Sequence, residues 1–332
     1  MKGRRALALA GLLLPLLTAC SLLVSTDGLG GGDPLRPDAG FDSPVSVTDA
    51  PASETAPQVD AGPDAAGPCD VTKPFGPRTA FAPPISTPSN ETAGYFSPDR
   101  LTLYFGSNRA GAGDLFVSRR STELGNWSLP DGLTVLNSAE RDSDPWVSSD
   151  ELEVYFDTSR PTTVTASNVF YAKRPSVGDA FSTPVLVSGV SSNYDEYEPW
   201  LPPSHDRLYF SSNRGGAGTF ELFFSQGSGS TFGPPTLIPG LVSSTNQESP
   251  ILTADQLTIY FSAARVGTLG KLDIWTASRA NKDAAFGAVQ HLPELSSPAD
   301  DYPTWLSDDG CRMIIQSYAT GDSELSYAER PK

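Results

Sequence analysis

Short runs of aromatic and β-branched residues, separated by turns rich in Gly, Pro, Asn, Asp and Ser, recur along the chain from about Lys73 to Arg330. The clearest run ends in Tyr-Phe and occupies residues 103–105, 154–156, 208–210 and 259–261. An aspartate in a turn precedes each run, and a fifth such aspartate, Asp309, precedes the run Met-Ile-Ile. Runs of this length and composition predict β strands. Their spacing of roughly fifty residues indicates five copies of one structural unit.

Each unit contains four segments that read as strands. A Pro-Trp or Pro-Ile segment such as 145–146 comes first, and the Tyr-Phe run follows. A third run resembles Asp-Leu-Phe-Val at 114–117, and a fourth, such as 181–185, contains proline. Proline is tolerated on an outer edge strand, which can spare a hydrogen-bond donor. One antiparallel blade cannot bury both of its faces, so we expect the blades to pack around a common axis.

The recurring order of Ser-x-Asp, Tyr-Phe, Ser-x-Arg and Asp-Ile-Trp resembles the WD40-like β-propeller repeat of the TolB type. The resemblance covers about 260 residues and implies an all-β propeller that scaffolds protein–protein contacts. The copies in the chain favour five blades, and a degenerate sixth is the alternative, because TolB-type propellers more often have six. The repeated arginines at 109, 160, 214 and 265 are interpreted as structural, and Ala319 stands in that place in the fifth unit.

The two ends of the repeat region indicate how the ring closes. The fifth unit has no outer strand, whereas Lys73–Phe81 reads as an outer strand without a blade. Placing that segment on the fifth unit completes the ring and covers an exposed edge. Cys69 precedes the closing segment and Cys311 lies in the fifth unit, so a disulfide between them would fasten the ring. Two free thiols are the alternative.

The first residues read as a targeting signal. Lys2, Arg4 and Arg5 precede an apolar stretch at 6–17, which is too short to span a bilayer as a helix. The following Leu-Thr-Ala-Cys resembles the lipobox of bacterial lipoproteins, which implies cleavage after residue 19 and lipidation of Cys20. The lipid would anchor the chain in the cell envelope, and Ser21 favours the outer membrane by analogy with that family. An ordinary secretory signal is the alternative.

Composition refines this organisation. The segment 20–70 is dominated by Asp, Pro, Ala, Gly, Ser and Thr and cannot bury enough apolar surface to fold, so it predicts a disordered linker. The expected parts are therefore a signal peptide at 1–19, the linker at 20–70 and the propeller at 71–332. The formal charge of −16 argues against nucleic-acid binding, which requires clustered Lys and Arg.

Acidic residues recur just before the innermost strands and predict a rim around one mouth of the central channel. Such a rim could bind Ca²⁺ or a basic partner surface, and a merely solvated acidic rim is the alternative. Apart from that option the sequence identifies no cofactor or metal site. The predicted rim residues are Glu91, Asp142, Asp144, Glu196, Glu198, Glu248, Asp300 and Asp301.

The sequence favours a non-enzymatic lipoprotein whose propeller binds a protein partner. No Gly-x-Ser-x-Gly motif accompanies the two histidines, His205 and His291, and no catalytic residue is identified. The alternative is a carbohydrate-binding or glycoside-hydrolysing propeller. Glycoside hydrolysis requires two carboxylates at a defined separation, which spacing along a chain does not establish.

Overall fold

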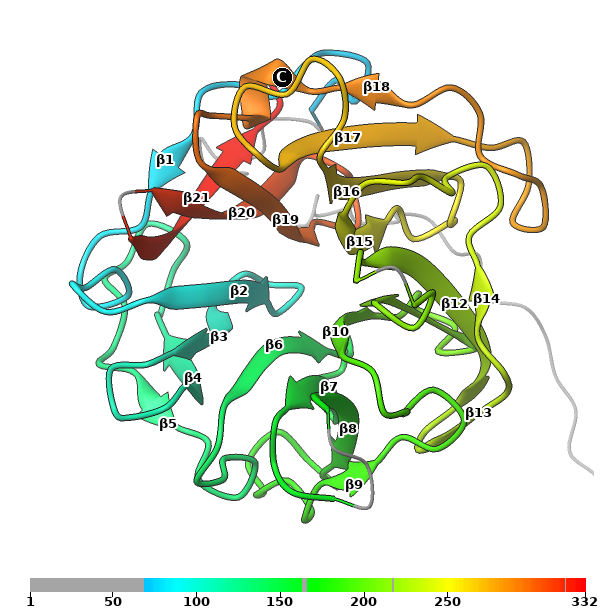
Figure 1. Cartoon of the computed structure of the whole chain (residues 1–332). Helices are drawn as coiled ribbons and strands as arrows, with labels where there is room; N and C mark the ends of the chain where they lie inside the picture. Colours follow the sequence, from blue (N-terminus) through cyan, green and yellow to red (C-terminus); the bar gives the residue numbers. More distant parts are fainter. Residues whose placement is uncertain (1–68, 163–165, 217, 320) are drawn as a thin grey trace, which may run out of the picture. The chain divides into compact units, whose positions relative to one another are not determined.

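The computed structural model describes residues 69–162, 166–216, 218–319 and 321–332, which form one β-propeller. Five antiparallel sheets surround a central axis (Figure 1), so the expected five-bladed all-β fold is confirmed. The predicted signal peptide, Cys20 and the linker up to residue 68 lie outside the described residues. Within the described ranges, no helix has both the length and the apolar character needed to cross a bilayer.

Each blade contains four positions, counted outward from the axis. The innermost strands are β2 (Glu91–Phe96), β6 (Asp142–Val147), β10 (Glu196–Trp200), β15 (Gln247–Leu252) and β19 (Asp300–Leu306). The second strands are β3 (Thr102–Ser107), β7 (Glu153–Thr158), β11 (Arg207–Ser212), β16 (Thr258–Ala263) and β20 (Arg312–Ala319). The third strands are β4 (Asp114–Arg119), β8 (Asn168–Lys173), β12 (Glu221–Ser228), β17 (Asp273–Ser278) and β21 (Asp322–Glu329).

The outer strands are only two residues long. They are β5 (Asp131–Gly132), β9 (Val185–Leu186), β14 (Thr236–Leu237), β18 (Gln290–His291) and, in the fifth blade, β1 (Thr79–Ala80). The third blade adds β13 (Thr231–Phe232), and a short 3-10 helix spans Pro293–Leu295. In the second to fourth blades the outer strands lie at or just beyond the ends of the predicted segments, whose first residues, Phe181, Phe232 and Phe286, are buried.

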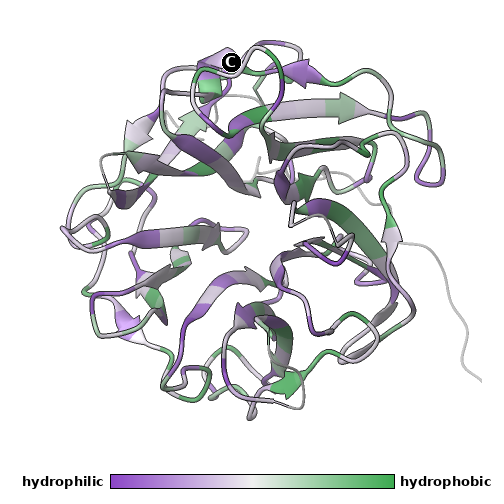
Figure 2. Cartoon of the chain, viewed as in Figure 1, coloured by the Kyte–Doolittle hydropathy of each residue, from purple (hydrophilic) through white to green (hydrophobic). Residues whose placement is uncertain are grey.

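The Tyr-Phe run explains why the blades pack together. Successive side chains of a strand point to opposite faces of a sheet. In β7, Tyr155 lies edge-on to Phe232 of the third blade, with ring centroids 6.3 Å apart, whereas Phe156 belongs to a hydrophobic cluster with Leu115 of the first blade. Figure 2 shows the hydrophobic segments within the strands and hydrophilic stretches on innermost strands such as β6.

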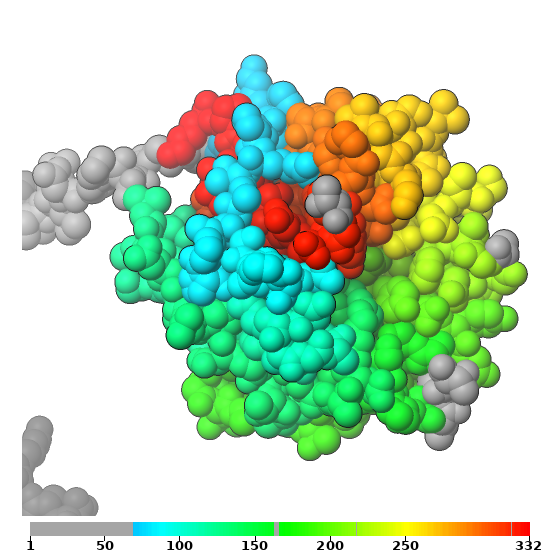
Figure 3. All heavy atoms as spheres, turned by 60° about the vertical axis from the view of Figure 1, so that its left-hand side comes forward, coloured from blue at the N-terminus to red at the C-terminus, as the bar shows by residue number. Residues whose placement is uncertain are grey.

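The ring closes as the sequence predicts. β1 pairs with β21, with Thr79 opposite Tyr327 and Ala80 opposite Ser326. Figure 3 shows the start of the described chain, in blue and cyan, beside the last strands, in red. The Cys69–Cys311 disulfide is present, with Cα atoms 5.6 Å apart. Strand pairing and a covalent bond therefore hold the first and last parts of the propeller together.

The turn between the first two strands of each blade uses a left-handed residue. In four blades this residue follows a turn aspartate, as Arg100 follows Asp99. In the third blade it is His205, with φ of 51°. Ser204 therefore occupies the aspartate position. The expectation that a turn aspartate precedes every run is wrong in the third blade, where the aspartate, Asp206, lies two positions later in the chain.

Candidate functional site

In the structure, the eight predicted rim acids form two groups of four, one buried in the blades and the other at the mouth of the channel. Four of them have no exposed surface and each accepts a hydrogen bond from an arginine. These pairs are Glu91–Arg109 at 2.9 Å, Asp142–Arg160 at 2.7 Å, Glu196–Arg214 at 2.6 Å and Asp301–Arg78 at 2.6 Å. The four carboxylates are buried in the walls of the blades rather than on a solvated rim.

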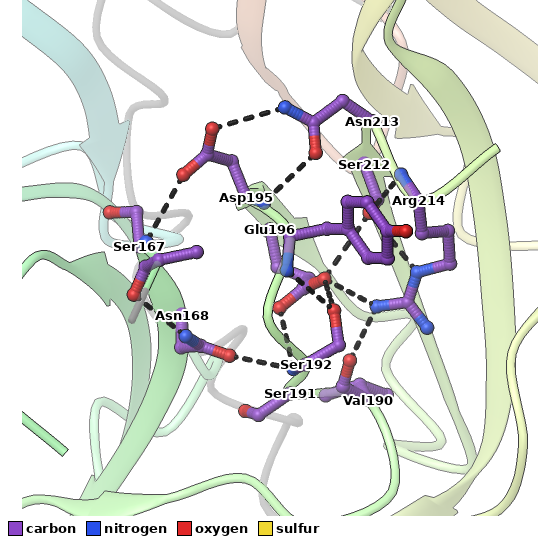
Figure 4. A network of polar contacts seen from close by, with 12 residues as sticks. Ser167, Asn168, Val190, Ser191, Ser192, Asp195, Glu196, Ser212, Asn213 and Arg214 are labelled. Atoms are coloured by element: carbon purple, nitrogen blue, oxygen red, sulfur yellow. Dashed lines mark hydrogen bonds and ion pairs between the residues drawn. The ribbon is translucent and has the colours of Figure 1, made fainter. Parts of the chain in front are cut away.

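Figure 4 shows this arrangement in the third blade. Arg214 donates to Glu196 and, through Nε, to the hydroxyl of Ser212 at 3.0 Å. The backbone N–H and hydroxyl of Ser192 also donate to Glu196, at 3.0 and 2.6 Å. Every donor comes from the same blade or from the loop that leads into it. These contacts explain the repeated arginines as structural residues.

The fourth and fifth blades vary this pattern. In the fourth blade Gln247 replaces the acid and accepts from Arg265 at 2.6 Å. In the fifth blade, which lacks the repeated arginine, Arg78 arrives from the closing segment and donates to Asp301 and to Ser317 at 2.8 Å. The side-chain pairing that the sequence left open is therefore completed by a residue more than 220 positions away in the chain.

Asp144 and Glu198 belong to the second group, at the mouth, and line a cavity on the axis. Each lies at a β-bulge with a left-handed backbone, with φ of 53° and 58° respectively. A bulge re-aims the side chain it carries, which places these two carboxylates in the channel, whereas Asp142 and Glu196 two residues earlier are buried in the blade. The bulge thus separates two acids that would share one face of a regular strand.

The cavity between these carboxylates has a volume of about 30 Å³. This space is comparable to the share of one water molecule in the liquid. Tyr95, Trp146, Trp200 and Ile251 line it together with the prolines of the innermost strands. Among the described residues, no group of three or more His, Cys, Asp or Glu side chains is arranged to hold a metal ion.

Few donors neutralise the channel acids. Glu198 accepts from the Ser211 hydroxyl at 2.5 Å and from the backbone N–H of Ser249 at 2.6 Å. Asp144 pairs with Arg141 at 3.1 Å. Burial and the charge of Asp144 raise the pKa of Glu198 to about 7. Burial and the charges of Glu198, Asp300 and Asp144 raise the pKa of Glu248 to about 8.

A further acid, Asp157 on β7, was not predicted as a site residue. Its carboxyl group is fully buried and accepts from Arg141 at 2.7 Å, while its Oδ1 has no donor among the described residues. Burial raises the pKa of Asp157 well above its usual range, and the charge of Asp144 raises it further. The sequence held a signal, because the equivalent second-strand residues in the other repeats, such as Ser211 and Ser262, are uncharged.

Three tyrosines border the same mouth and were also missed. Tyr318 is 42% exposed and lies edge-on to Tyr302, with ring centroids 5.8 Å apart. Tyr197 stacks on Phe220 and carries the Arg141 guanidinium 5.3 Å above its ring. Burial raises the pKa of Tyr302 and of Tyr318, and the charges of the channel acids raise both further. We call Asp144, Glu198, Glu248, Asp300 and these three tyrosines the acidic mouth.

Asp300, the last predicted rim residue, lies at the edge of the acidic mouth. It accepts from the Leu272 backbone at 3.0 Å and is 4.0 Å from the exposed ammonium of Lys271. Of the eight predicted acids, the structure therefore brings four together at the mouth and places the other four inside the blades.

Comparison with solved structures supports the fold. A thermostable family-43 glycoside hydrolase matches at a TM-score of 0.53 and 13% identity, over 75% of this chain and 91% of the hydrolase. An endo-arabinase from Bacteroides thetaiotaomicron matches at 0.52 and 14%, over 76% of this chain and 98% of the arabinase. A putative TolB from Agrobacterium tumefaciens matches at 0.48 and 17%, over 73% and 77%. At these identities, the two matches with a TM-score above 0.5 show the fold alone.

The sequence comparisons add no relative. No protein-family model matches the chain, and no curated protein matches it. Function must therefore be argued from the acidic mouth itself.

Proposed function

We propose that this protein is a non-enzymatic interaction module whose acidic mouth binds a basic side chain of a protein partner. The observation that carries the proposal is the excess of carboxyl groups over cations. Asp144, Glu198 and Glu248 repel one another, and Arg141 is already shared by Asp144 and Asp157. An ammonium or guanidinium group from a partner would relieve this repulsion.

The tyrosines of the acidic mouth fit the same partner. Aromatic faces attract Lys and Arg through cation–π interaction, as Tyr197 already does with Arg141. Tyrosines also serve as rigid anchors in protein interfaces. A basic segment with its charge at the carboxylates would therefore find aromatic walls around it.

The size of the cavity favours binding over hydrolysis. Two carboxyl groups cleave a glycosidic bond only when a sugar ring fits between them. The space lined by Asp144 and Glu198 is about 30 Å³, far below the roughly 300–1,000 Å³ of pockets that enclose small-molecule ligands. The narrow tip of a lysine or arginine side chain requires far less room.

A titration with matched peptides tests this proposal. The probe is a fluorescent decapeptide with one central lysine, and its control carries acetyl-lysine, which has no charge. We expect the full-length mature chain at pH 8 to bind the lysine peptide at least tenfold more tightly. Glu198→Gln should remove that preference, whereas Asp131→Asn, on the exposed outer strand β5, should preserve it. Equal binding of both peptides would contradict the proposal.

Carbohydrate binding or cleavage is the second candidate, because the exposed ring of Tyr318 beside carboxylates could stack on a sugar. Incubation with arabinan and with cell-wall glycan distinguishes it. Release of reducing ends that Asp144→Asn or Glu198→Gln abolishes would replace the first proposal with a hydrolase.

We further propose that Cys20 carries a lipid that anchors the chain in the cell envelope, with the outer membrane favoured. The basis is the lipobox-like Leu-Thr-Ala-Cys after an apolar stretch. Metabolic labelling with a fatty-acid probe should label the chain and fail with Cys20→Ala. Labelling that persists in that variant would contradict the anchor.

A further inference from the structure

The fifth blade departs from the other four at the face that carries the acidic mouth. In blades one to four, six or more residues separate the second strand from the third, as in 108–113 of the first blade. In the fifth blade β20 ends at Ala319 and β21 begins at Asp322, so this loop is nearly absent. β20 is eight residues long, whereas the other second strands have six.

The shortened loop coincides with a groove of about 550 Å³, far larger than the cavity on the axis. Its walls come from β1, β20, β21 and the Ser297–Ala299 loop. The exposed lining is mainly apolar, with Ala80, Pro298, Ala299 and Tyr318 contributing. A groove of this volume has room for a large side chain and the backbone beside it.

Apart from the exposed side chains of Glu324 and Tyr318, the polar groups in the walls are engaged within the blade. Arg78 donates to Asp301 and Ser317, and the Ser297 hydroxyl donates to Asp301 at 2.8 Å. Ser326 donates to the Ile315 carbonyl. The guanidinium is therefore neutralised, and the groove does not attract an anion. Its free surface favours an apolar or aromatic group.

Tyr318 joins the groove to the acidic mouth. It lines the groove, packs against Tyr302, and the charge of Asp144 acts on its hydroxyl. A ligand whose charge lies at Asp144 and Glu198 can therefore extend past Tyr318 into the groove.

We propose that this groove binds a large apolar or aromatic side chain of the partner, on the same segment as the basic side chain held in the acidic mouth. This inference rests on the proposed function. The bipartite site would select a protein segment that pairs a Lys or Arg with a nearby Trp, Phe or Leu, because aromatic anchors in pockets dominate many interfaces.

The test uses two peptides that contain the same lysine and differ at one position. Two residues from that lysine, one peptide has Trp and the other has Ala. We expect the full-length mature chain to bind the Trp peptide at least tenfold more tightly. Ala80→Trp, which fills the groove from exposed β1, should remove this advantage and leave the Ala peptide unaffected. Ala82→Trp, at an exposed position outside the groove, is the matched control and should keep the advantage.

The outcomes separate the two proposals. Equal affinity of the two peptides for the unmodified chain would overturn the groove and leave the acidic mouth standing. Failure of both peptides to bind would overturn both proposals. Binding of a cell-wall oligosaccharide that Ala80→Trp blocks and Ala82→Trp does not would assign the groove to a glycan and overturn its role in a protein interface. Tyr318→Ala provides an independent check. It should weaken binding of the Trp peptide more than binding of the Ala peptide.

Discussion

Glu196 and Glu198 stand two residues apart on β10, and their carboxylates have opposite surroundings. Glu196 has no exposed surface and accepts from Arg214, Ser192 and Ser212. Glu198 lies at the bulge, faces the channel and is repelled by Asp144. The same residue type thus stabilises a blade in one position and leaves uncompensated charge in the other. The difference lies in the cation: Arg214 donates to Glu196, whereas the donors to Glu198 among the described residues, the Ser211 hydroxyl and the Ser249 N–H, are neutral.

The largest effect on stability is expected for the disulfide that links the first and last parts of the propeller. Replacing both Cys69 and Cys311 with Ser should lower the free energy of unfolding by about 5 kcal/mol, since the disulfide closes a loop with a sequence separation of 242. Urea unfolding of the two oxidised full-length chains measures the difference. A loss below about 1 kcal/mol would show that Arg78 and β1 close the ring without covalent help.

The next largest effect is expected for a buried ion pair within a single blade. Arg214→Ala leaves Glu196 buried without its cation and should cost about 3–5 kcal/mol. Glu196→Gln should cost much less, because Gln247 already pairs with Arg265 in this way in the fourth blade. Urea unfolding of the two variants compares them. Equal losses would mean that the ion pair has no special role at this position.

The channel acids predict how stability varies with pH. The pKa values of Glu198 and Glu248 rise from 4.5 to about 7 and 8 on folding, so the folded chain binds protons more tightly than the unfolded chain. Their contribution to stability is complete below pH 4.5 and is lost as the pH rises through 7 and 8. The melting temperature should therefore fall between pH 5 and pH 8.5.

The double variant Glu198→Gln, Glu248→Gln tests this dependence of the melting temperature on pH. Thermal unfolding should then vary less between pH 5 and pH 8.5. The turn carboxyls of Asp99 and Asp150 have lowered pKa values and remain ionised throughout this range, so they do not contribute. An unchanged slope would show that the two channel glutamates are not its source.

The smallest effect concerns Glu248 alone. At pH 8.5, Glu248→Gln should raise the free energy of unfolding by about 1 kcal/mol, because it removes repulsion from Glu198 and Asp300. Asp131→Asn, at an exposed position, should change it by less than about 0.5 kcal/mol. A destabilising Glu248→Gln would indicate that this carboxylate has a stabilising partner in the folded chain.

Much of the fold follows from local pattern. The Tyr-Phe runs, the turn aspartates and the period near fifty residues predict strand, turn and blade, because strand alternation and turn chemistry act over a few residues. The closing strand and the Cys69–Cys311 bridge follow from counting which segments lack a partner. The position of the third turn does not, since Ser204 and His205 replace the usual pair there without changing the turn.

The site depended on three-dimensional placement. By itself the sequence determined a five-unit propeller, an acidic rim and repeated structural arginines. Only the tertiary structure decided that Asp142 and Asp144 face different surroundings, that Arg78 replaces the missing fifth arginine, and that Tyr318 lies between the acidic mouth and the groove. The physical reason is that a carboxylate's role depends on which donors lie within hydrogen-bonding distance. A β-bulge and the closure of a ring set those distances between residues that the sequence keeps far apart.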